Sequence, residues 1–275
     1  MLGRIRRGVR AGMRWVARDE TVTSAGRSAL VLAPHPDDET LGCGATILRK
    51  VAAGTPVTVA LVTDGRNSHR SAHLTPDDLA VLRKAEMTEA AARLGLAPGS
   101  VRWGGFVDGT LSDREEELVS YLEGLLLELR PDEVYTTSAV EPHPDHSALG
   151  RAARRAVSTT YGAPRLLEYP VWLWGSWPLR RGDRLGSTFQ AASTIARRRV
   201  VKVRAGAHLA GKLHALRAHS SQLSRPVGVP ADEEWASLPP PLLDAAADRA
   251  ELFLPWAAPA PAAAVRPAVC FPDAG

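Results

Sequence analysis

The sequence predicts an α/β protein with a mostly parallel β-sheet that is covered by helices on both faces. From about residue 28, short runs rich in β-branched residues alternate with longer amphipathic runs, and parallel strands need helical crossovers of that length. With 45% hydrophobic and 23% charged residues, the chain has the composition of a folded globular protein. Because strand and helix candidates alternate along most of the chain, we expect parallel strands joined by right-handed crossovers.

The first element expected in the chain is a helix. Leu2, Ile5, Val9, Met13 and Val16 recur at steps of three and four residues, which is the spacing of an amphipathic helix. Strand candidates follow at 28–34, 56–65, 100–106, 132–138 and 165–172. Helix candidates lie between these strands at 39–53, 76–94, 113–129 and 145–161.

Two of the helix starts carry capping signals. Thr75 precedes Pro76, which predicts an N-cap followed by proline at the first helical position. Ser112 and Glu115 have the spacing of a capping box. We therefore expect helices to begin near residues 76 and 113.

Composition divides the chain into three regions. Residues 1–27 form a basic amphipathic segment, residues 28–254 a single α/β domain, and residues 255–275 a tail rich in proline and alanine. Within the domain, the pattern becomes irregular after Trp172, where Trp, Pro and Gly are frequent. That stretch predicts a lid and a rim over a site rather than a part of the sheet.

The charge of the chain comes largely from arginine. The formal net charge is +4, but the Arg clusters lack interleaved aromatic residues and any nucleic-acid motif, so no nucleic-acid partner is expected. For the basic N-terminal helix, docking by its apolar stripe is favoured, with peripheral contact to a membrane as the alternative. No apolar run is long enough to span a bilayer, and a cytoplasmic location is expected. Cys43 and Cys270 show no spacing typical of a disulfide framework or a metal site.

The first strand candidate runs into an acidic loop, "PHPDDE" at 34–39. The loop places His35 and the carboxylates of Asp37, Asp38 and Glu39 at the end of a parallel strand, where open α/β sheets bind ligands. Capping the following helix would need only one carboxylate. Because like charges on a short loop are tolerated when a cation lies among them, the loop predicts a metal site.

A dinucleotide site is the alternative interpretation of this region. "GCGATI" at 42–47 lies between a strand and a helix, and Asp64 ends the second strand twenty residues after Gly44. However, Ile47 stands where the third glycine is expected, and a pyrophosphate would face three carboxylates of the same sign of charge. The sequence therefore favours the metal.

The second half of the metal site follows a later strand candidate, in "EPHPDHS" at 141–147. Because loops after parallel strands meet above the same edge of the sheet, His35, Asp38 and His146 are expected to bind zinc and to leave one position open for water. Asp37, next to a ligand, is then the expected general base. No role is assigned to His69, His73, His208 or His214.

Five motifs in order resemble the PIG-L/LmbE-like N-deacetylase family. They are "PHPDDE", "TDG" at 63–65, "RKAE" at 83–86, "HPDH" at 143–146 and "KLHALRAHSSQ" at 212–222. The family includes N-acetylglucosaminyl-phosphatidylinositol deacetylases and bacterial mycothiol- and bacillithiol-pathway deacetylases. The resemblance implies a Rossmann-like fold without a nucleotide, one zinc ion per chain, and hydrolysis of an N-acyl group on a glucosamine-type sugar. It also implies that His143 is the cationic partner of the tetrahedral intermediate and that Asp145 holds its ring.

Three charged side chains are candidates for contact with the sugar. Arg83 either contributes to sugar binding or pairs with Glu86 one helical turn further on. Asp64 and Asp108, each followed by glycine, either bind sugar hydroxyls or are turn carboxylates.

Three tryptophans, Trp172, Trp174 and Trp177, recur over six residues. They form either an aromatic wall for the sugar and a bulky aglycone or a packed lid. The function expected is zinc-dependent N-deacetylation of a small glycoconjugate, such as a natural-product, thiol-cofactor or cell-envelope conjugate. The alternatives are hydrolysis of another amide or ester, and a non-catalytic relative that only binds ligand or metal.

Overall fold

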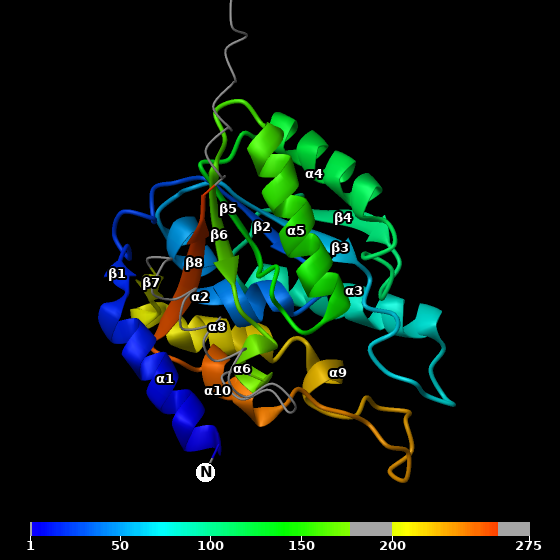
Figure 1. The fold of residues 1–275 in the computed structure, drawn as a ribbon. Helices are drawn as coiled ribbons and strands as arrows, with labels where there is room; N and C mark the ends of the chain where they lie inside the picture. Colours follow the sequence, from blue (N-terminus) through cyan, green and yellow to red (C-terminus); the bar gives the residue numbers. More distant parts are fainter. Residues whose placement is uncertain (1, 177–199, 258–275) are drawn as a thin grey trace, which may run out of the picture.

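The centre of the protein is a mostly parallel sheet (Figure 1). A computed structural model describes residues 2–176 and 200–257. In these residues, eight strands form one sheet in the order β1-β7-β8-β6-β5-β2-β3-β4. The strands are β1 (Arg18–Asp19), β2 (Ala29–Ala33), β3 (Val57–Thr63), β4 (Val101–Phe106), β5 (Glu133–Thr137), β6 (Arg165–Tyr169), β7 (Val201–Arg204) and β8 (Ala250–Trp256). The helices are α1 (Leu2–Val16), α2 (Asp38–Ala52), α3 (Pro76–Arg93), α4 (Glu115–Leu129), α5 (Pro144–Thr159), α6 (Leu173–Ser176), α8 (Leu209–Leu216), α9 (Ser220–Leu223) and α10 (Pro240–Ala246), with a 3₁₀ turn at Gly206–His208.

Five neighbouring strands, β6, β5, β2, β3 and β4, are parallel to one another. They match the five strand candidates of the sequence, and helices α2, α3, α4 and α5 connect them. The predicted α/β architecture is therefore confirmed. β8 is antiparallel to both β6 and β7, and β1 is parallel to β7.

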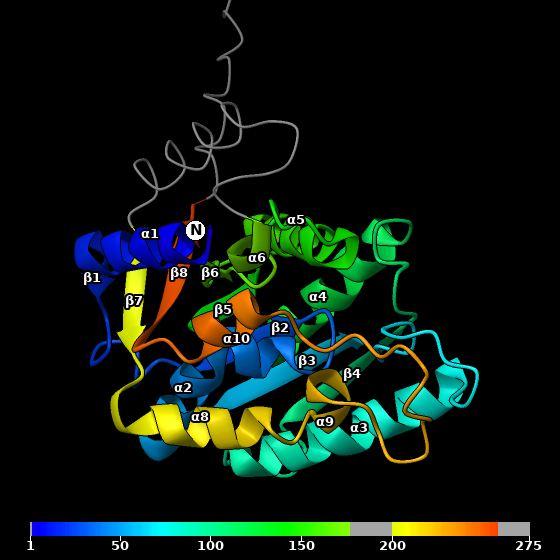
Figure 2. The same ribbon diagram turned by 90° about the horizontal axis from the view of Figure 1, so that it is seen from below.

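Alternate residues of the central strands face opposite layers of helices. On β2, Val31 and Ala33 belong to the core that includes α2, α3 and α8, whereas Leu30 and Leu32 belong to the core that includes α4 and α5. Figure 2 shows these two layers on opposite sides of the sheet. Because both faces are buried, the strands read as continuous apolar runs in the sequence.

The two predicted helix starts have different outcomes. Thr75 and Asp78 form a capping box at the start of α3, with proline at the first position, as predicted. The predicted capping box of Ser112 and Glu115 is wrong, because α4 begins at Glu115 itself and no side chain caps it. Just before this helix, Leu111 is buried and its N–H donates to a carboxylate of α5. This tertiary contact, rather than a local cap, fixes the entry to α4.

The region after Trp172, predicted as a lid and a rim, also contributes two strands to the sheet. β7 has four residues within an Arg-rich stretch, so its local pattern is too short to indicate a strand. It forms because β8 pairs with it along all four residues. β8 continues to Trp256, so the boundary predicted at residue 255 falls inside a strand.

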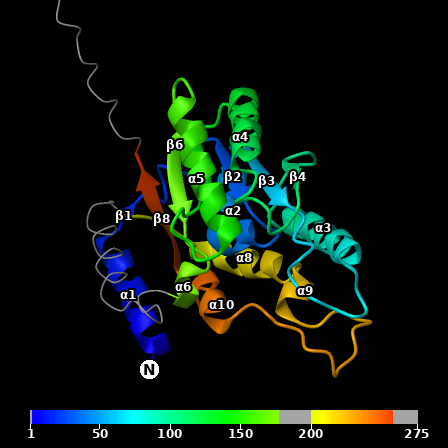
Figure 3. The same ribbon diagram turned by 45° about the vertical axis from the view of Figure 1, so that its right-hand side comes forward.

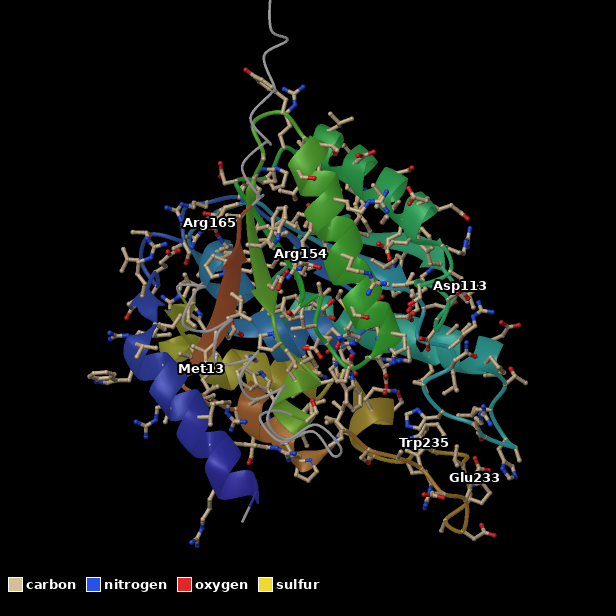
Figure 4. All side chains as sticks on the ribbon, viewed as in Figure 1. Met13, Asp113, Arg154, Arg165, Glu233 and Trp235 are labelled. Carbon is tan, nitrogen blue, oxygen red and sulfur yellow. The ribbon has the colours of Figure 1, made fainter. Side chains whose placement is uncertain are left out.

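The basic N-terminal segment is docked on the domain. Met13 of α1 packs with Leu252 and Leu254 of β8, and Figure 4 shows Met13 between the two elements. The guanidinium of Arg14 pairs with Asp248, and β1 then extends the edge of the sheet. Within the described ranges, no helix combines the length and the apolar character needed to cross a bilayer.

The chain leaves β2 and β5, which are neighbours, in opposite directions across the sheet. From β2 it passes outward to β3 and β4, and it then returns to β5 and moves outward to β6 on the other side. The crevice at the carboxyl ends of two such strands is the place where open α/β sheets bind ligands. The loops after β2 and β5 carry the two predicted metal motifs.

Candidate active site

The loop after β2 enters α2 through a strained residue. Asp37 has a φ of 126° and a ψ of −28°, a region that residues other than glycine rarely adopt. Its carboxylate makes no capping hydrogen bond with α2. Asp37 is therefore not a simple helix cap, and strain of this kind clusters at functional sites.

Three side chains from the two motifs meet above the sheet. His35, Asp38 and His146 each offer one ligand atom, and these atoms all lie within 4.8 Å of one another. Oδ2 of Asp38 is 3.2 Å from Nδ1 of His35 and 3.2 Å from Nε2 of His146. All three residues are buried. The structure thus brings together the three residues expected as metal ligands.

This set of donor atoms fits a divalent metal ion. Although the side chain of His146 is fully buried, neither of its ring nitrogens makes a regular hydrogen bond among the described residues, and Nε2 has its 3.2 Å contact with Asp38. Buried ring nitrogens normally make one. Burial by itself would raise the pKa of Asp38, but His146 and His35 hold it below its usual range. Two imidazoles and one ionised carboxylate suit zinc and similar metals and leave a coordination position open.

Asp145 contacts His35 rather than His143. Its Oδ2 is 3.3 Å from Nε2 of His35, and its two oxygens accept the N–H groups of Gly109 and Leu111 at 2.7 and 3.1 Å. Nδ1 of His143 is buried without a hydrogen-bond partner in the described ranges. The ligand atoms of His35, His143 and Asp145 also lie within 4.8 Å of one another. No hydrogen bond joins Asp145 to His143 among the described residues, so the support of the His143 ring that was expected from Asp145 stays a prediction.

His143 lies near the other two histidines and Trp172. Its ring centroid is 4.9 Å from that of His35 and 5.0 Å from that of His146, and it is 6.2 Å from the ring of Trp172. Burial, followed by the effects of His35 and His146, lowers the pKa of His143 to about 4. The resting imidazole is therefore neutral near pH 7, which differs from the cationic partner implied by the family resemblance.

The carboxylate of Asp37 is paired with Arg83. Its Oδ2 is 3.4 Å from Nη2 of Arg83, and the guanidinium also donates to the backbone carbonyls of Pro36 and Gly65. Burial raises the pKa of Asp37 to about 7, although Arg83 opposes this rise. The alternative pairing of Arg83 with Glu86 is wrong, because the Glu86 carboxylate accepts hydrogen bonds from another segment. Arg83 is thus part of the site.

Asp108 lies in the site and Asp64 does not. Oδ1 of Asp108 is 3.0 Å from Nε2 of His35, and its Oδ2 accepts the N–H of Asn67 at 2.9 Å. Burial by itself would raise the pKa of Asp108, but these contacts lower it to about 2. Asp64 instead accepts hydrogen bonds from the N–H and the guanidinium of Arg66, so it is the turn carboxylate of the two alternatives.

The predicted tryptophan wall separates into different places. Trp172 lines the same cavity as the metal cluster. Trp174 belongs to the cluster of Met13 on α1, and the guanidinium of Arg10 lies 5.8 Å from its ring centroid. The expected substrate contact of Trp174 is therefore wrong, because the short helix α6 turns it toward the N-terminal segment. Trp177 lies outside the described residues.

A cavity of about 350 Å³ lies beside the metal cluster, and this volume is within the range of small-molecule sites. Its polar lining includes His35, Asp37, Asp38, Arg83, Asp108 and His143. Its apolar lining includes Leu41, Val171, Trp172, Leu238, Pro239 and Leu242. The cavity therefore offers an apolar surface beside a cluster of charged and metal-ligating groups.

Sequence reasoning assigned no role to three buried side chains next to the site. Glu39 accepts the N–H of Asp37 at 3.0 Å, and Nε2 of His219 is 3.3 Å from the other oxygen of Glu39. Glu141 accepts the N–H groups of Val171 and Leu173 at 2.6 and 3.1 Å, and burial raises its pKa to about 8. All three lie inside motifs that the sequence shows, Glu141 at the start of "EPHPDHS", but their partners other than Asp37 come from distant segments that no local pattern indicates.

Comparison with known proteins gives a consistent picture. Residues 30–157 match the family described as "PIG-L: GlcNAc-PI de-N-acetylase". A "Probable N-acetyl-alpha-D-glucosaminyl L-malate deacetylase 2" of Bacillus cereus is 36% identical over 48% of this chain and 61% of its own. A "1D-myo-inositol 2-acetamido-2-deoxy-alpha-D-glucopyranoside deacetylase" of Streptomyces avermitilis is 32% identical over 47% of this chain and 52% of its own. The matched part thus spans between half and two thirds of each of these relatives.

The fold is shared as well. The crystal structure of a conserved protein from Thermus thermophilus superposes with a TM-score of 0.58 at 28% identity, over 83% of this chain and 94% of that one. The matched family region contains both loops of the metal cluster. The motifs, the sequence relatives and the fold agree, and residues 30–157 of this chain match the PIG-L family of de-N-acetylases.

Proposed function

We propose that the protein is a zinc-dependent N-deacetylase that hydrolyses the acetamide of an N-acetylglucosamine-type conjugate. The observation that carries the proposal is that Asp37 lines one cavity together with His35 and Asp38, which form a cluster with the buried His146. The relatives named above, which are described as deacetylases of glucosaminyl conjugates, support the class of substrate.

In this proposal His35, Asp38 and His146 hold one zinc ion. When bound, zinc would polarise the amide carbonyl and make water more acidic. Asp108 and Asp145 contact Nε2 of His35, and such carboxylates orient a ligating imidazole. Their contribution is to keep this ring at a fixed place in the cluster.

Asp37 is the proposed general base. A base is most effective when its pKa lies near the working pH, and burial places the pKa of Asp37 at about 7. Its carboxylate accepts a proton from the attacking water as the oxygen bonds to the carbonyl carbon. Arg83 restrains this carboxylate from the side of α3.

His143 is the proposed partner of the reacting amide. With a pKa of about 4 its ring is neutral, so it can donate an N–H hydrogen bond to the developing oxyanion without carrying a charge. The bond between the carbonyl carbon and nitrogen then breaks, and the proton taken by Asp37 passes to the leaving amine. The products are acetate and the free amino sugar.

Zinc content and acetyl release test the proposal together. The metal content of the purified protein is measured, and loss of an acetyl group is followed by mass spectrometry over a panel of N-acetylglucosaminides with different aglycones. We expect about one zinc per chain and acetyl release that stops after chelation and returns with added zinc. Full activity of the metal-free protein would overturn the proposal. Hydrolysis of esters only, or ligand binding without hydrolysis of any panel member, would favour the two alternative functions.

A further inference from the structure

Glu39 and His219 form a buried ion pair behind the loop that carries Asp37. Nε2 of His219 is 3.3 Å from Oε1 of Glu39, and both side chains have 0% exposure. Oε2, the other oxygen of the same carboxylate, accepts the backbone N–H of Asp37 at 3.0 Å. A buried carboxylate is stable only with such partners, so the pair joins His219 to the backbone of Asp37.

The N–H of Asp37 belongs to a residue with a φ of 126°. This conformation persists only where surrounding contacts impose it. Two contacts hold it, one from α3 and one from the start of α2. Arg83 pairs with the Asp37 carboxylate and donates to the Pro36 carbonyl, and Glu39 accepts the Asp37 N–H.

His219 is itself anchored on α3. Glu86, one turn after Arg83 on α3, accepts hydrogen bonds from the hydroxyl of Ser220 at 2.8 Å and from the N–H and hydroxyl of Ser221 at 2.7 and 2.8 Å. Figure 3 shows α9, which begins at Ser220, beside α3. One helix therefore restrains Asp37 twice, directly through Arg83 and indirectly through the segment that places His219.

We propose that Glu39 and His219 are positioning residues for Asp37, which hold its backbone in the strained conformation that aims its carboxylate at the metal cluster. The inference rests on the proposed role of Asp37 as the base. It gives three motifs of the sequence, "PHPDDE", "RKAE" and the "HSS" of 219–221, a shared role, which is to hold the backbone and the carboxylate of Asp37. Neither residue lines the cavity, so each acts through Asp37 and not by contact with substrate.

A second buried ion pair provides a matched control. Glu251 accepts the N–H groups of Ala45 and Thr46 on α2, each at 2.8 Å, and pairs with the buried Lys212 at 2.8 Å. The pair of Glu251 and Lys212 resembles the pair of Glu39 and His219, because in both a buried carboxylate links a buried basic side chain to backbone N–H groups. The carboxylate of Glu251 contacts the middle of α2, and Lys212 also donates to the carbonyl of Leu41 nearer the start of that helix, but within the described residues neither side chain forms a hydrogen bond or an ion pair with the Asp37 loop.

The test compares His219→Leu, His219→Gln and Lys212→Met. His219→Leu and Lys212→Met each remove the cation from a buried pair, and we expect both to lower Tm. Only His219→Leu is expected to lower kcat, by about tenfold to a hundredfold as for a misplaced catalytic group, with KM and metal content nearly unchanged. His219→Gln, which keeps a donor toward Glu39, is expected to recover much of kcat.

A double-mutant cycle with Asp37→Asn shows whether His219 acts through Asp37. We expect His219→Leu to have almost no further effect on kcat once the base is gone. The inference would be overturned if the double variant lost kcat by the product of the two single effects, or if His219→Leu lost its metal. An equal loss of kcat in Lys212→Met would also overturn it.

Hydrogen exchange of the Asp37 amide, measured by NMR, is independent of any activity. We expect faster exchange in His219→Leu and an unchanged rate in Lys212→Met. If the wild type deacetylates nothing in the panel, the proposed function fails. The exchange rate of the Asp37 amide then still tests whether Glu39 and His219 hold this N–H. Unchanged exchange in His219→Leu overturns the inference even when the wild type is a deacetylase.

Discussion

The guanidinium of Arg83 lies 3.4 Å from the carboxylate of Asp37 and donates to the backbone carbonyls on two loops of the site. Burial of Asp37 favours its protonated form, and Arg83 favours its ionised form. The balance between the two places the pKa of Asp37 at about 7. A change in either one therefore moves the pH at which the proposed base becomes active.

Replacement of Arg83 tests that balance. In Arg83→Met the ionised form of Asp37 loses its cation, so its pKa rises and the acidic limb of kcat/KM moves to higher pH. The looser carboxylate is expected to lower the maximal rate by up to about a hundredfold. The measurement is the pH dependence of kcat/KM, with metal content as the control. An acidic limb at its original pH would show that Asp37 does not produce it.

The neighbouring residues Asp37 and Asp38 are expected to respond differently to substitution. Asp38→Ala removes one of three ligands and should lose both metal and activity. Asp37→Asn should keep the metal and the fold and lower kcat by roughly a hundredfold to ten-thousandfold, the usual contribution of a general base. Zinc stoichiometry, Tm and kcat are measured for both variants. Equal loss of metal in the two would mean that the base is wrongly assigned.

The two tryptophans near the site should also differ. Trp172→Ala removes an apolar surface of the cavity, so we expect a higher KM for conjugates with a bulky aglycone and a smaller effect on the simple sugar. Trp174→Ala removes packing against α1 and should lower stability by about 1–3 kcal/mol without changing KM. Steady-state kinetics on both substrates, together with thermal unfolding, separate these effects. A raised KM in Trp174→Ala would contradict the assignment.

Glu141 is expected to make stability depend on pH. Its pKa of about 8 in the folded protein lies above the ordinary value of 4.5, so the folded state binds the proton more tightly than the unfolded state. This contribution to stability is complete at low pH and is lost as pH rises from about 4.5 to about 8. Glu141→Gln keeps an acceptor for the two N–H groups and should lack this loss. Tm of the two proteins is compared across that range, and parallel curves would contradict the prediction.

Removal of residues 1–18 should destabilise the protein without changing the chemistry. The deletion exposes the surface of β8 that Met13 covers and removes Arg10 and Arg14, the two guanidinium partners of Asp248. None of the described residues of α1 lines the cavity. We expect a lower Tm and a nearly unchanged kcat per folded molecule. A large loss of kcat with intact folding would show that this segment reaches the site.

The core of the fold was predictable from the sequence because its signals are local. The strand 29–33 is buried on both faces and therefore reads as an uninterrupted apolar run, and Thr75 and Asp78 satisfy each other within four residues. β7 was not predictable, because it has only four residues and depends on pairing with β8, almost fifty residues later in the chain. Its existence is a property of the assembled sheet.

By itself the sequence determined which residues could bind a metal, because imidazole and carboxylate groups after two parallel strands of one sheet must lie at the same edge. His35, Asp38 and His146 are such a set. Only the tertiary structure decided the partners of the remaining groups: Arg83 with Asp37, Asp145 with His35, Trp174 with α1, and His219 with Glu39. The physical reason is that burial and charge depend on side chains brought together from distant parts of the chain, and those determine both the pKa of Asp37 and the conformation that it is held in.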